Sequence, residues 1–322
     1  MTQFLANQHI VVLLGGPSAE REVSLVTGAL CADALERLGA RVSRVDPGPA
    51  LPSGVAHVLT ALAPDLVFNA LHGRWGEDGC VQGVLETLGL AYTHSGVLAS
   101  ALAMDKARSK AVLAAAGLTV PGGGLYSRHD VARDHVMQPP YVVKPNAEGS
   151  SVGVFIVPEG ANRPPQQLAA PDWSHGDQVM VEPFVPGREL SVAVLGRPTG
   201  PRALAVTEIR SSTGFYDYDA KYAQGGSVHV LPALIPDAVR DRAMRAAELG
   251  HAILGCRGVT RADFRYDDIN DLLVLLEVNT QPGMTPTSLV PEQADHVGVS
   301  FDRLVFWILE DAYARCSAGG TA

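Results

Sequence analysis

The sequence lacks the spacings of thiolate metal sites and of disulfide frameworks. Its 322 residues include only four cysteines, none of them in a CxxC pair, and its ten histidines contain no HExxH spacing. Zinc-binding and disulfide-stabilised proteins normally show such spacings. We therefore expect reduced, buried cysteines and no metal held by histidine.

Long apolar runs and a basic leader are also missing. The apolar run near the N-terminus extends only from Ile10 to Leu14, and no other stretch is long enough to cross a bilayer. The formal net charge of -9 disfavours a general nucleic-acid surface. These absences predict a cytoplasmic protein that has neither a membrane nor a nucleic acid as its partner.

Two common nucleotide-binding fingerprints do not occur. The chain has no GxxxxGK[ST] sequence, and GxGxxG does not follow the first predicted strand, residues 9–16. Neither a P-loop enzyme nor a dinucleotide-dependent dehydrogenase is therefore supported. The loop GGPSAEREVSL instead places Glu20 at this point, where a carboxylate suits an ammonium ligand. The alternative is that Glu20 only stabilises the N-terminus of the next helix, the commoner role for such a residue.

Strand and helix patterns alternate in the first third of the chain. Buried strands are predicted at 9–16 and 65–73, and a helix at 22–38. The predicted apolar face of this helix comprises Val23, Val26, Leu30 and Ala34. Alternation of this kind favours a parallel sheet.

After Gly124 the pattern changes to short β-type runs separated by turns, which predict antiparallel sheets. The segment EPFVPGREL, residues 182–190, has two prolines and a glycine between two strands and predicts a hinge. We therefore expect an α/β protein (α+β overall) with an N-terminal open parallel α/β domain followed by two lobes with largely antiparallel sheets. The expected domains are 1–103, 104–187 and 188–322.

The clearest chemical pattern lies in a predicted hairpin, residues 260–279. Asp263 on the first strand is expected to lie near Glu277 and Asn279 on the second, because the turn DDIND brings the two strands together. Two carboxylates and an amide oxygen are ligands that Mg²⁺ accepts, together with water and phosphate oxygens. The alternative is an ordinary solvated hairpin end, and for this stretch alone that interpretation is the better one.

A second phosphate signal occurs in VVKPNAEGSSVGVFIV, residues 142–157. Lys144 ends one strand, and glycines at 149 and 153 permit a tight loop whose N-H groups and serine hydroxyls form an anion-binding nest. The polar loop ALHGRWGEDGCVQG follows a buried strand and offers His72 and Glu77, although a lone histidine is more often structural. The segment 211–222 is either a lid or a mobile surface loop.

Together these stretches resemble the signature segments of the D-alanine:D-alanine ligases of the ATP-grasp superfamily, over about residues 10–310. The matching blocks, in order, are LLGGPSAEREVSL, ALHGRWGEDG, ASALAMDKARSK, VVKPNAEGSSVG, GFYDYDAKY and EVNTQPGMTPTSLVP. The resemblance implies the ATP-grasp fold and an enzyme that phosphorylates one D-alanine with ATP and joins it to a second. Its dipeptide product would serve peptidoglycan precursor synthesis. The resemblance also implies two Mg²⁺ ions, for which Mn²⁺ could substitute, and a cytoplasmic homodimer.

The resemblance also assigns roles to individual residues. The ATP-binding group would comprise Lys106, Lys144, Ser151, Val152, Glu182, Phe184, Val185 and Glu189. The catalytic group would comprise Glu20, Ser150, Tyr222, Arg261 and Gly283. The residues binding D-alanine would be His72, Lys221, Ser288 and Leu289, and the metal ligands would be Asp263, Glu277 and Asn279. Glu20, Ser150 and Tyr222 would join by hydrogen bonds when the lid closes.

Some positions depart from the expected family pattern. Pro17 replaces a threonine, Phe184 stands where a tryptophan is common, and Gln281 replaces a small serine beside the metal ligands. One competing interpretation is a related ligase whose second substrate is D-lactate or D-serine. Another is a binding regulator that kept the fold without turnover, but such a protein would not need the metal ligands and Arg261.

Overall fold

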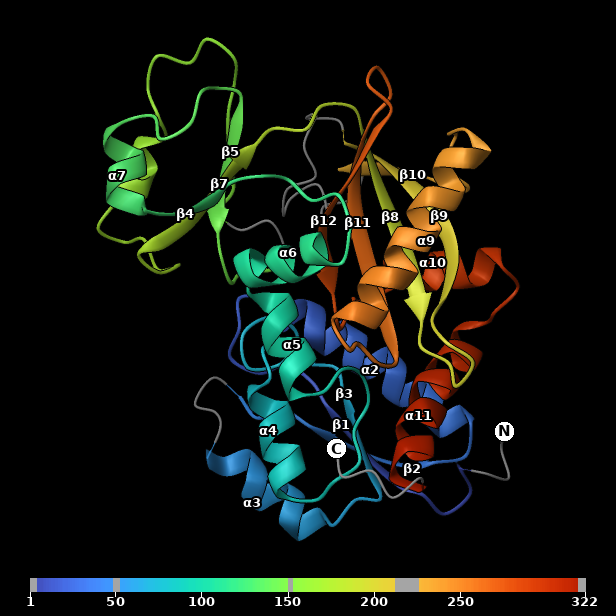
Figure 1. The fold of residues 1–322 in the computed structure, drawn as a ribbon. Coiled ribbons are helices and arrows are strands. Elements are labelled where there is room, and N and C mark those ends of the chain that lie inside the picture. Colours follow the sequence, from blue (N-terminus) through green and yellow to red (C-terminus); the bar gives the residue numbers. More distant parts are fainter. Residues whose placement is uncertain (1–4, 49–52, 150–152, 212–225, 318–322) are drawn as a thin grey trace.

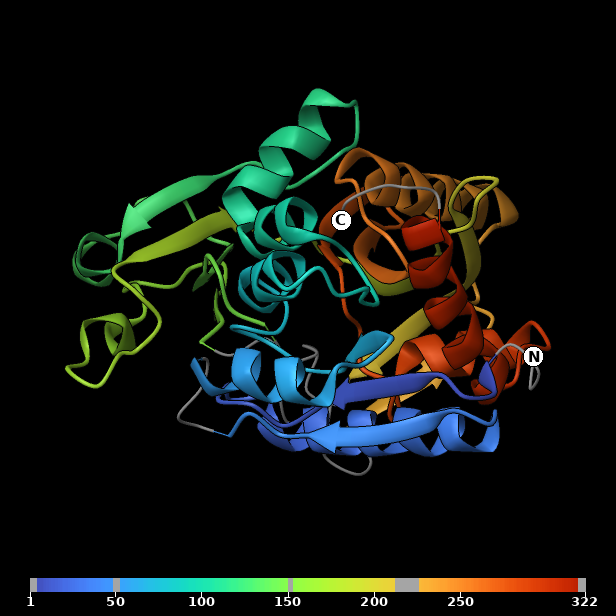
Figure 2. The same cartoon turned by 90° about the horizontal axis from the view of Figure 1, so that it is seen from below.

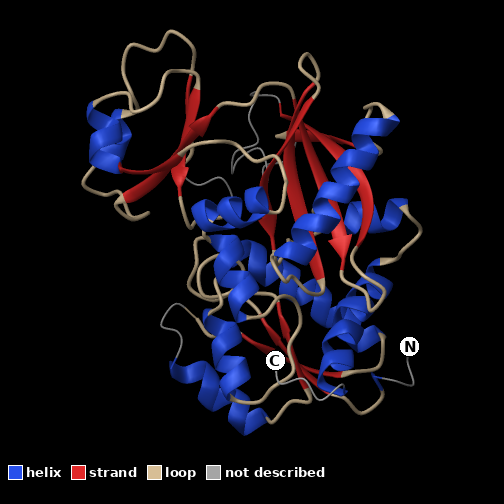
Figure 3. Ribbon diagram, viewed as in Figure 1, coloured by secondary structure: helices blue, strands red, loops and turns tan. Residues whose placement is uncertain are grey.

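Three β-sheets organise the part of the chain that the structure, a computed structural model, describes: residues 5–48, 53–149, 153–211 and 226–317 (Figures 1 and 3). The first sheet is parallel and the other two are antiparallel, as the sequence predicts. None of the described helices is both long enough and apolar enough to cross a membrane.

The N-terminal sheet has the strand order β2-β1-β3. Alternate side chains of β1 enter two different cores: Ile10 and Val12 pack toward α2, whereas Val11 and Leu13 pack toward α3 and α4. Helices therefore cover both faces of this sheet. Its elements are β1 (His9–Leu13), α2 (Arg21–Arg37), β2 (Arg41–Val45), α3 (Ser53–Leu62), β3 (Leu66–Asn69) and α4 (Cys80–Thr87).

The predicted buried face of α2 is partly wrong. Val26 is 47% exposed, whereas Gly28 and Cys31 face the sheet. A side chain at Gly28 would collide with Leu14, so this glycine lets the helix lie close to the end of β1. Small residues define the packed face here, and an apolar pattern alone does not detect them.

The cysteine prediction also needs one correction. The described cysteines are free thiols, but only Cys31 is buried, Cys256 is partly buried and Cys80 is exposed. Cys80 begins α4, and its position at the start of a surface helix accounts for its exposure.

Two helices, α5 (Val97–Met104) and α6 (Lys106–Ala115), lead from the N-terminal sheet to the small antiparallel sheet, which has the order β4-β7-β5-β6. This sheet has its own core, which includes Tyr141 and Leu168. Its elements are β4 (Gly124–Ser127), α7 (Arg128–Arg133), β5 (Tyr141–Pro145), β6 (Phe155–Val157), the 3₁₀ helix η1 (Gln166–Ala169) and β7 (Gln178–Pro183).

The large antiparallel sheet follows directly and has the order β10-β9-β8-β11-β12. The chain passes from β7 to β8 through residues 184–187, the segment predicted as a hinge. The strands are β8 (Arg188–Leu195), β9 (Arg202–Ser211), β10 (Ser227–Val230), β11 (Val259–Asp267) and β12 (Leu272–Asn279). The helices are α9 (Asp237–Ile253), α10 (Leu289–His296) and α11 (Phe301–Ser317).

The last helix returns to the beginning of the chain. α11 packs against α2, and Leu304 and Leu309 belong to the same apolar core as Leu35 of α2 (Figures 1 and 2). Val259 at the start of β11 shares this core. The N-terminal sheet and the large sheet are therefore joined by apolar packing, while the bounds of the three predicted domains stay a prediction.

Candidate active site

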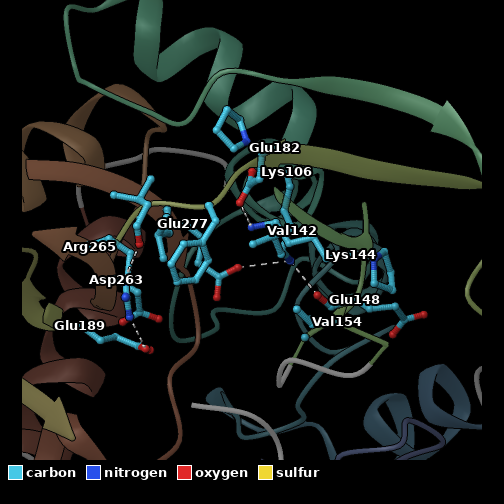
Figure 4. A pocket seen from close by; sticks show the side chains of 16 residues that line it. Lys106, Val142, Lys144, Glu148, Val154, Glu182, Glu189, Asp263, Arg265 and Glu277 are labelled. Carbon is cyan, nitrogen blue, oxygen red and sulfur yellow. Dashed lines mark hydrogen bonds and ion pairs between the residues drawn. The ribbon is translucent and has the colours of Figure 1, made fainter. Parts of the chain in front are cut away.

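A cleft of about 870 Å³ lies between the small and the large antiparallel sheets (Figure 4). Its walls come from β5, β7, β11 and β12, so strands from both lobes face the same space. The predicted ATP and metal residues that line it are Lys106, Lys144, Glu182, Phe184, Val185, Glu189, Asp263 and Glu277.

A buried carboxylate organises the basic groups of this cleft. Glu182 on β7 accepts from Lys144 on β5 at 2.5 Å, and it also pairs with Lys110 of α6. Burial opposes its charge, but the two lysines hold the pKa of Glu182 below its ordinary value. Burial likewise acts to lower the pKa of Lys144, but the carboxylates of Glu182 and Glu277 raise it. Lys144 therefore stays a cation although it is buried.

Lys110 is a member of this site that the sequence analysis did not single out. Burial, followed by repulsion from Lys144, lowers its pKa to about 7. It lies one helical turn after Lys106 in the block ASALAMDKARSK, so the four-residue spacing was the available signal. Its partner Glu182 is 72 positions away in sequence, and no local pattern reveals that pairing.

Lys106 connects the phosphate loop with the predicted metal hairpin. Its ammonium donates to the carbonyl of Glu148 at 2.7 Å and lies 3.2 Å from a carboxylate oxygen of Glu277 (Figure 4). This places one positive charge between the loop after β5 and the end of β12. Such a position suits a phosphate group held between them.

The predicted hairpin is present and brings the expected residues together. Asp263 on β11 is paired with Glu277 on β12, and Arg261 with Asn279. Asp263 accepts from Arg261 at 2.8 Å, from the Asn279 amide at 3.0 Å and from the Ser191 hydroxyl at 2.7 Å. The three predicted metal ligands are therefore held together at the edge of the ATP cleft.

The chemistry of these side chains fits a hard divalent cation. All three offer oxygen atoms, and neither histidine nor thiolate accompanies them. Within the described residues, no three His, Cys, Asp or Glu side chains gather as a ligand set. Two carboxylates, the Asn279 amide and phosphate oxygens from the nucleotide would complete the coordination of Mg²⁺ or Mn²⁺.

At the other end of the cleft, Arg265 fixes the segment between the two lobes. Its guanidinium donates to the carbonyls of Val185 at 3.0 Å and Gly187 at 2.8 Å, and it lies 5.6 Å from the centre of the Phe184 ring. It also faces Glu189 at 3.5 Å. Arg265 was not predicted, because in the sequence it is only the next residue on the same strand face as Asp263, two positions further along.

A second cleft, of about 680 Å³, adjoins the first. Gly149 lines both, and a side chain at Gly149 would reach within 2.7 Å of a Glu20 carboxylate oxygen. The loop after β5 therefore meets the N-terminal loop where the two clefts join. The predicted residues that line the second cleft are Glu20, His72, Arg261, Asn279, Gly283, Ser288 and Leu289.

His72 and Glu77, the two candidates in the polar loop, form a part-buried pair in this second cleft. The His72 Nδ1 lies 3.0 Å from Glu77, and its Nε2 lies 3.2 Å from the Thr27 hydroxyl. Burial acts to lower the pKa of His72, but the Glu77 carboxylate raises it above its ordinary value. Thr27, on α2, was not predicted, because its contact depends on how the helix packs.

The loop before α10 forms the opposite wall. The Ser288 hydroxyl accepts from the Thr285 backbone at 3.0 Å, and Leu289 is the first residue of α10. Leu289 is buried at the wall of the cleft. A helix N-terminus suits a carboxylate, and the role predicted for these two residues stays a prediction.

Five predicted residues lie outside the described part of the chain. They are Ser150, Ser151 and Val152 of the phosphate loop and Lys221 and Tyr222 of the predicted lid. Their roles, and the lid interpretation of 211–222, stay predictions.

Two family models and several known proteins match this chain. A family model described as the D-ala D-ala ligase C-terminus matches residues 127–310, and the corresponding N-terminus model matches residues 52–95. A D-alanine--D-alanine ligase from Caulobacter sp. (strain K31) is 83% identical over 99% of this chain and 98% of its own length. The same enzyme from Methylobacterium radiotolerans is 59% identical over 95% of this chain and 98% of its own length.

Two solved structures share the fold. The D-alanine--D-alanine ligase from Bacillus anthracis complexed with ATP has a TM-score of 0.80 at 28% identity, covering 97% of this chain and 100% of that one. The VanG D-Ala:D-Ser ligase from Enterococcus faecalis has a TM-score of 0.78 at 28% identity, covering 95% of this chain and 99% of that one.

Proposed function

The chain belongs to the D-alanine--D-alanine ligase family, and we propose that it joins two D-alanine molecules into D-alanyl-D-alanine while converting ATP to ADP and phosphate. The observation that carries this proposal is the junction of two clefts at Gly149. One cleft has buried lysines suited to phosphates, and the other has groups suited to an amino acid. A phosphoryl group can therefore pass from one ligand to the other without crossing solvent.

In the ATP cleft, Lys106 and Lys144 hold the phosphates, while Phe184, Val185 and Glu189 bind the nucleoside end. Glu182 keeps Lys144 aligned through its buried ion pair. Asp263, Glu277 and Asn279 would hold Mg²⁺, which when bound would neutralise phosphate charge and help to orient the terminal phosphoryl group. Arg265 holds the carbonyls of the crossing segment, which keeps the nucleoside wall in place.

In the amino-acid cleft, Glu20 receives the ammonium group of the first D-alanine, with His72 beside it. The carboxylate of this first D-alanine then faces the ATP cleft and accepts the phosphoryl group, giving an acyl phosphate. Arg261 and the Gly283 N-H stabilise the negative oxygen that forms when the second amine attacks. Ser288 and Leu289 hold the second carboxylate, and phosphate leaves from the tetrahedral intermediate.

Several expectations accompany this proposal. The family resemblance assigns roles to the five predicted residues outside the described segments: Ser151 and Val152 would bind the phosphates, Lys221 would bind the second carboxylate, and Ser150 and Tyr222 would act with Glu20 in lid closure. The enzyme acts as a cytoplasmic homodimer in peptidoglycan precursor synthesis. Light scattering of the pure protein tests the dimer, and a monomer at micromolar concentration would exclude it.

The test is an assay with ATP, Mg²⁺ and D-alanine that follows phosphate release and identifies the product by mass. We expect dipeptide from D-alanine and none from L-alanine. Parallel reactions with D-serine and D-lactate as second substrates are needed, because the VanG D-Ala:D-Ser ligase shares this fold. Protein that binds ATP but releases no phosphate with any of these substrates would instead be a binding regulator.

A further inference from the structure

The side chain of Gln281 joins two parts of the chain that are 212 residues apart in sequence. Its Oε1 accepts from the Asn69 amide at 2.9 Å, and its Nε2 donates to the carbonyl of Leu71. Asn69 is at the end of β3 in the N-terminal sheet, whereas Gln281 follows β12 of the large sheet. The link therefore connects two lobes of the molecule.

The link is buried and its main polar groups are paired. Gln281 is 3% exposed and Asn69 is fully buried. The second hydrogen of the Asn69 amide goes to the Gly76 carbonyl at 2.9 Å, and the Asn69 Oδ1 accepts from the Leu71 N-H at 3.2 Å. Losing one member would leave buried donors and acceptors without partners, which destabilises their present arrangement.

Both ends of the link continue directly into the amino-acid cleft. Leu71 precedes His72, so the N-terminal end governs the loop that carries His72 and Glu77. Gln281 itself lines the cleft, two residues after Asn279 and two before Gly283. The distance across the cleft, from the ammonium side to the acyl-oxygen side, therefore depends on this amide pair.

We propose that Gln281 is a positioning residue that sets the width of the first amino-acid subsite, an inference that rests on the function proposed above. The role needs one side chain with both an acceptor and a donor and with enough reach to span two lobes. Glutamine meets these requirements, whereas serine, the residue expected here from the family resemblance, is too short to bind both partners. Leucine has no polar group to offer them.

The first experiment compares wild-type enzyme with Gln281→Ser and Gln281→Asn. Initial rates over a wide range of D-alanine concentrations separate the first subsite from the second, and calorimetry gives the ATP dissociation constant. We expect Gln281→Ser to raise the first-subsite KM about tenfold, with smaller changes in kcat and with ATP affinity within about twofold of wild type. Gln281→Asn keeps both polar groups at shorter reach and should give about a threefold increase.

A matched control is available in the large sheet. Gln293 is also fully buried and uses its carboxamide to bind Ala193, Ser191 and Thr207, all within one lobe. Gln293→Ser should lower the melting temperature as Gln281→Ser does, but it should leave the first-subsite KM within about twofold. This contrast separates positioning from general loss of stability.

The coupling to Asn69 gives a readout that a purely structural role would not produce. Asn69→Ala should raise the same KM, and the double variant should be no worse than the more damaged single variant, because both remove one interaction. If the two single substitutions raised the first-subsite KM by factors that multiply in the double variant, the proposal would be overturned. An unchanged first-subsite KM in Gln281→Ser, or in Gln281→Asn if the serine variant does not fold, would also overturn it. Inactive wild-type enzyme would instead contradict the proposed function.

Discussion

At the scale of single residues, the charge balance of the ATP cleft depends on Glu182. Two lysines approach this buried carboxylate, but only Lys144 lines the cleft, while Lys110 lies behind it. A single carboxylate bonded by two lysines is oriented from both sides. Lys110 therefore acts on ATP indirectly, through the position of Glu182.

Replacing Lys110 by methionine removes one of these two supports with little change in volume. We expect Lys110→Met to weaken ATP binding about tenfold, because one charge-assisted hydrogen bond to a buried carboxylate is lost. Calorimetry with ATP measures this change, and the D-alanine KM should stay within about twofold. The control is Arg108→Met on the same helix, whose side chain is 79% exposed. Equal loss of ATP affinity in both variants would contradict the role of Lys110.

A different pair supports the loop that carries Glu20. Arg21 lies 2.5 Å from Asp46 and also donates to the Gly16 carbonyl, and the hydrogen bond from its guanidinium lowers the pKa of Asp46 to about 2. A depressed carboxyl pKa stabilises the folded state above the unfolded value of about 3.9, and this contribution is lost as the pH falls through about 2. Asp46→Asn should therefore cost about 1 kcal/mol at pH 7, after allowance for solvent screening.

Urea unfolding at several pH values measures this cost. The stability difference between wild type and Asp46→Asn should be constant from pH 7 to about 5 and should shrink below about pH 4. A difference of the same size at pH 2.5 would show that the ion pair does not cause it.

Whether a site residue can be predicted from the sequence depends on how far along the chain its interaction partner lies. Asp263, Glu277 and Asn279 could be predicted because one hairpin and a two-residue period bring them together. Lys110, Arg265 and Gln281 could not, since each acts on a group that is far away in sequence or belongs to the backbone. Long-range pairing leaves no periodic signal in a single sequence.

At the scale of secondary-structure elements, the same distinction holds. The order of strands and helices and the change from parallel to antiparallel sheets follow from local patterns. The buried face of α2 does not, because Gly28 and its contact with Leu14 decide it. Local sequence predicts which elements form, while small residues at contacts decide how closely they pack.

The crossing from β7 to β8 allows a direct test of such a contact. Gly187 has a φ of +94°, and a side chain there would collide with the carbonyl of Tyr266 on β11. Gly200, in the turn between β8 and β9, has a φ of +111° and nothing within 4 Å of an added side chain. A side chain added at either glycine would therefore meet the strain of a positive φ, but only at Gly187 would it also collide with a neighbouring strand.

We expect Gly200→Ala to cost about 1 kcal/mol from backbone strain alone. Gly187→Ala should cost more than about 3 kcal/mol, because a backbone contact in a packed sheet cannot relax cheaply. Denaturant unfolding measures both, and ATP affinity should fall only in Gly187→Ala, whose segment forms the nucleoside wall. Equal losses of unfolding free energy in the two variants would mean that β11 shifts away from the added side chain at no cost in free energy.

At the scale of the whole molecule, the cores do not follow the order of the chain. Residues of α2, β8 and α11 share one apolar core, which ties the N-terminal sheet to the large sheet. Arg37 and Asp302 add an ion pair between α2 and α11 at 2.6 Å. The small sheet has a separate core. Unfolding should therefore couple the first and last parts of the chain, while the small sheet can open independently.

Two leucines that are fully buried in different cores test this organisation. Leu304→Ala, in the shared core, should lower the unfolding free energy by about 3 kcal/mol and reduce hydrogen-exchange protection in both the N-terminal and the large sheets. Leu168→Ala, in the small-sheet core, should lower the free energy of unfolding of the small sheet by a similar amount. It should reduce hydrogen-exchange protection mainly in β4 to β7. Hydrogen exchange read by mass spectrometry distinguishes the two patterns. If Leu304→Ala exposed only α11 while the N-terminal sheet stayed protected, the shared core would not couple them. Because residues from more than one lobe line each cleft, ATP and D-alanine should restore protection across the lobes in Leu304→Ala, through binding to the folded state alone.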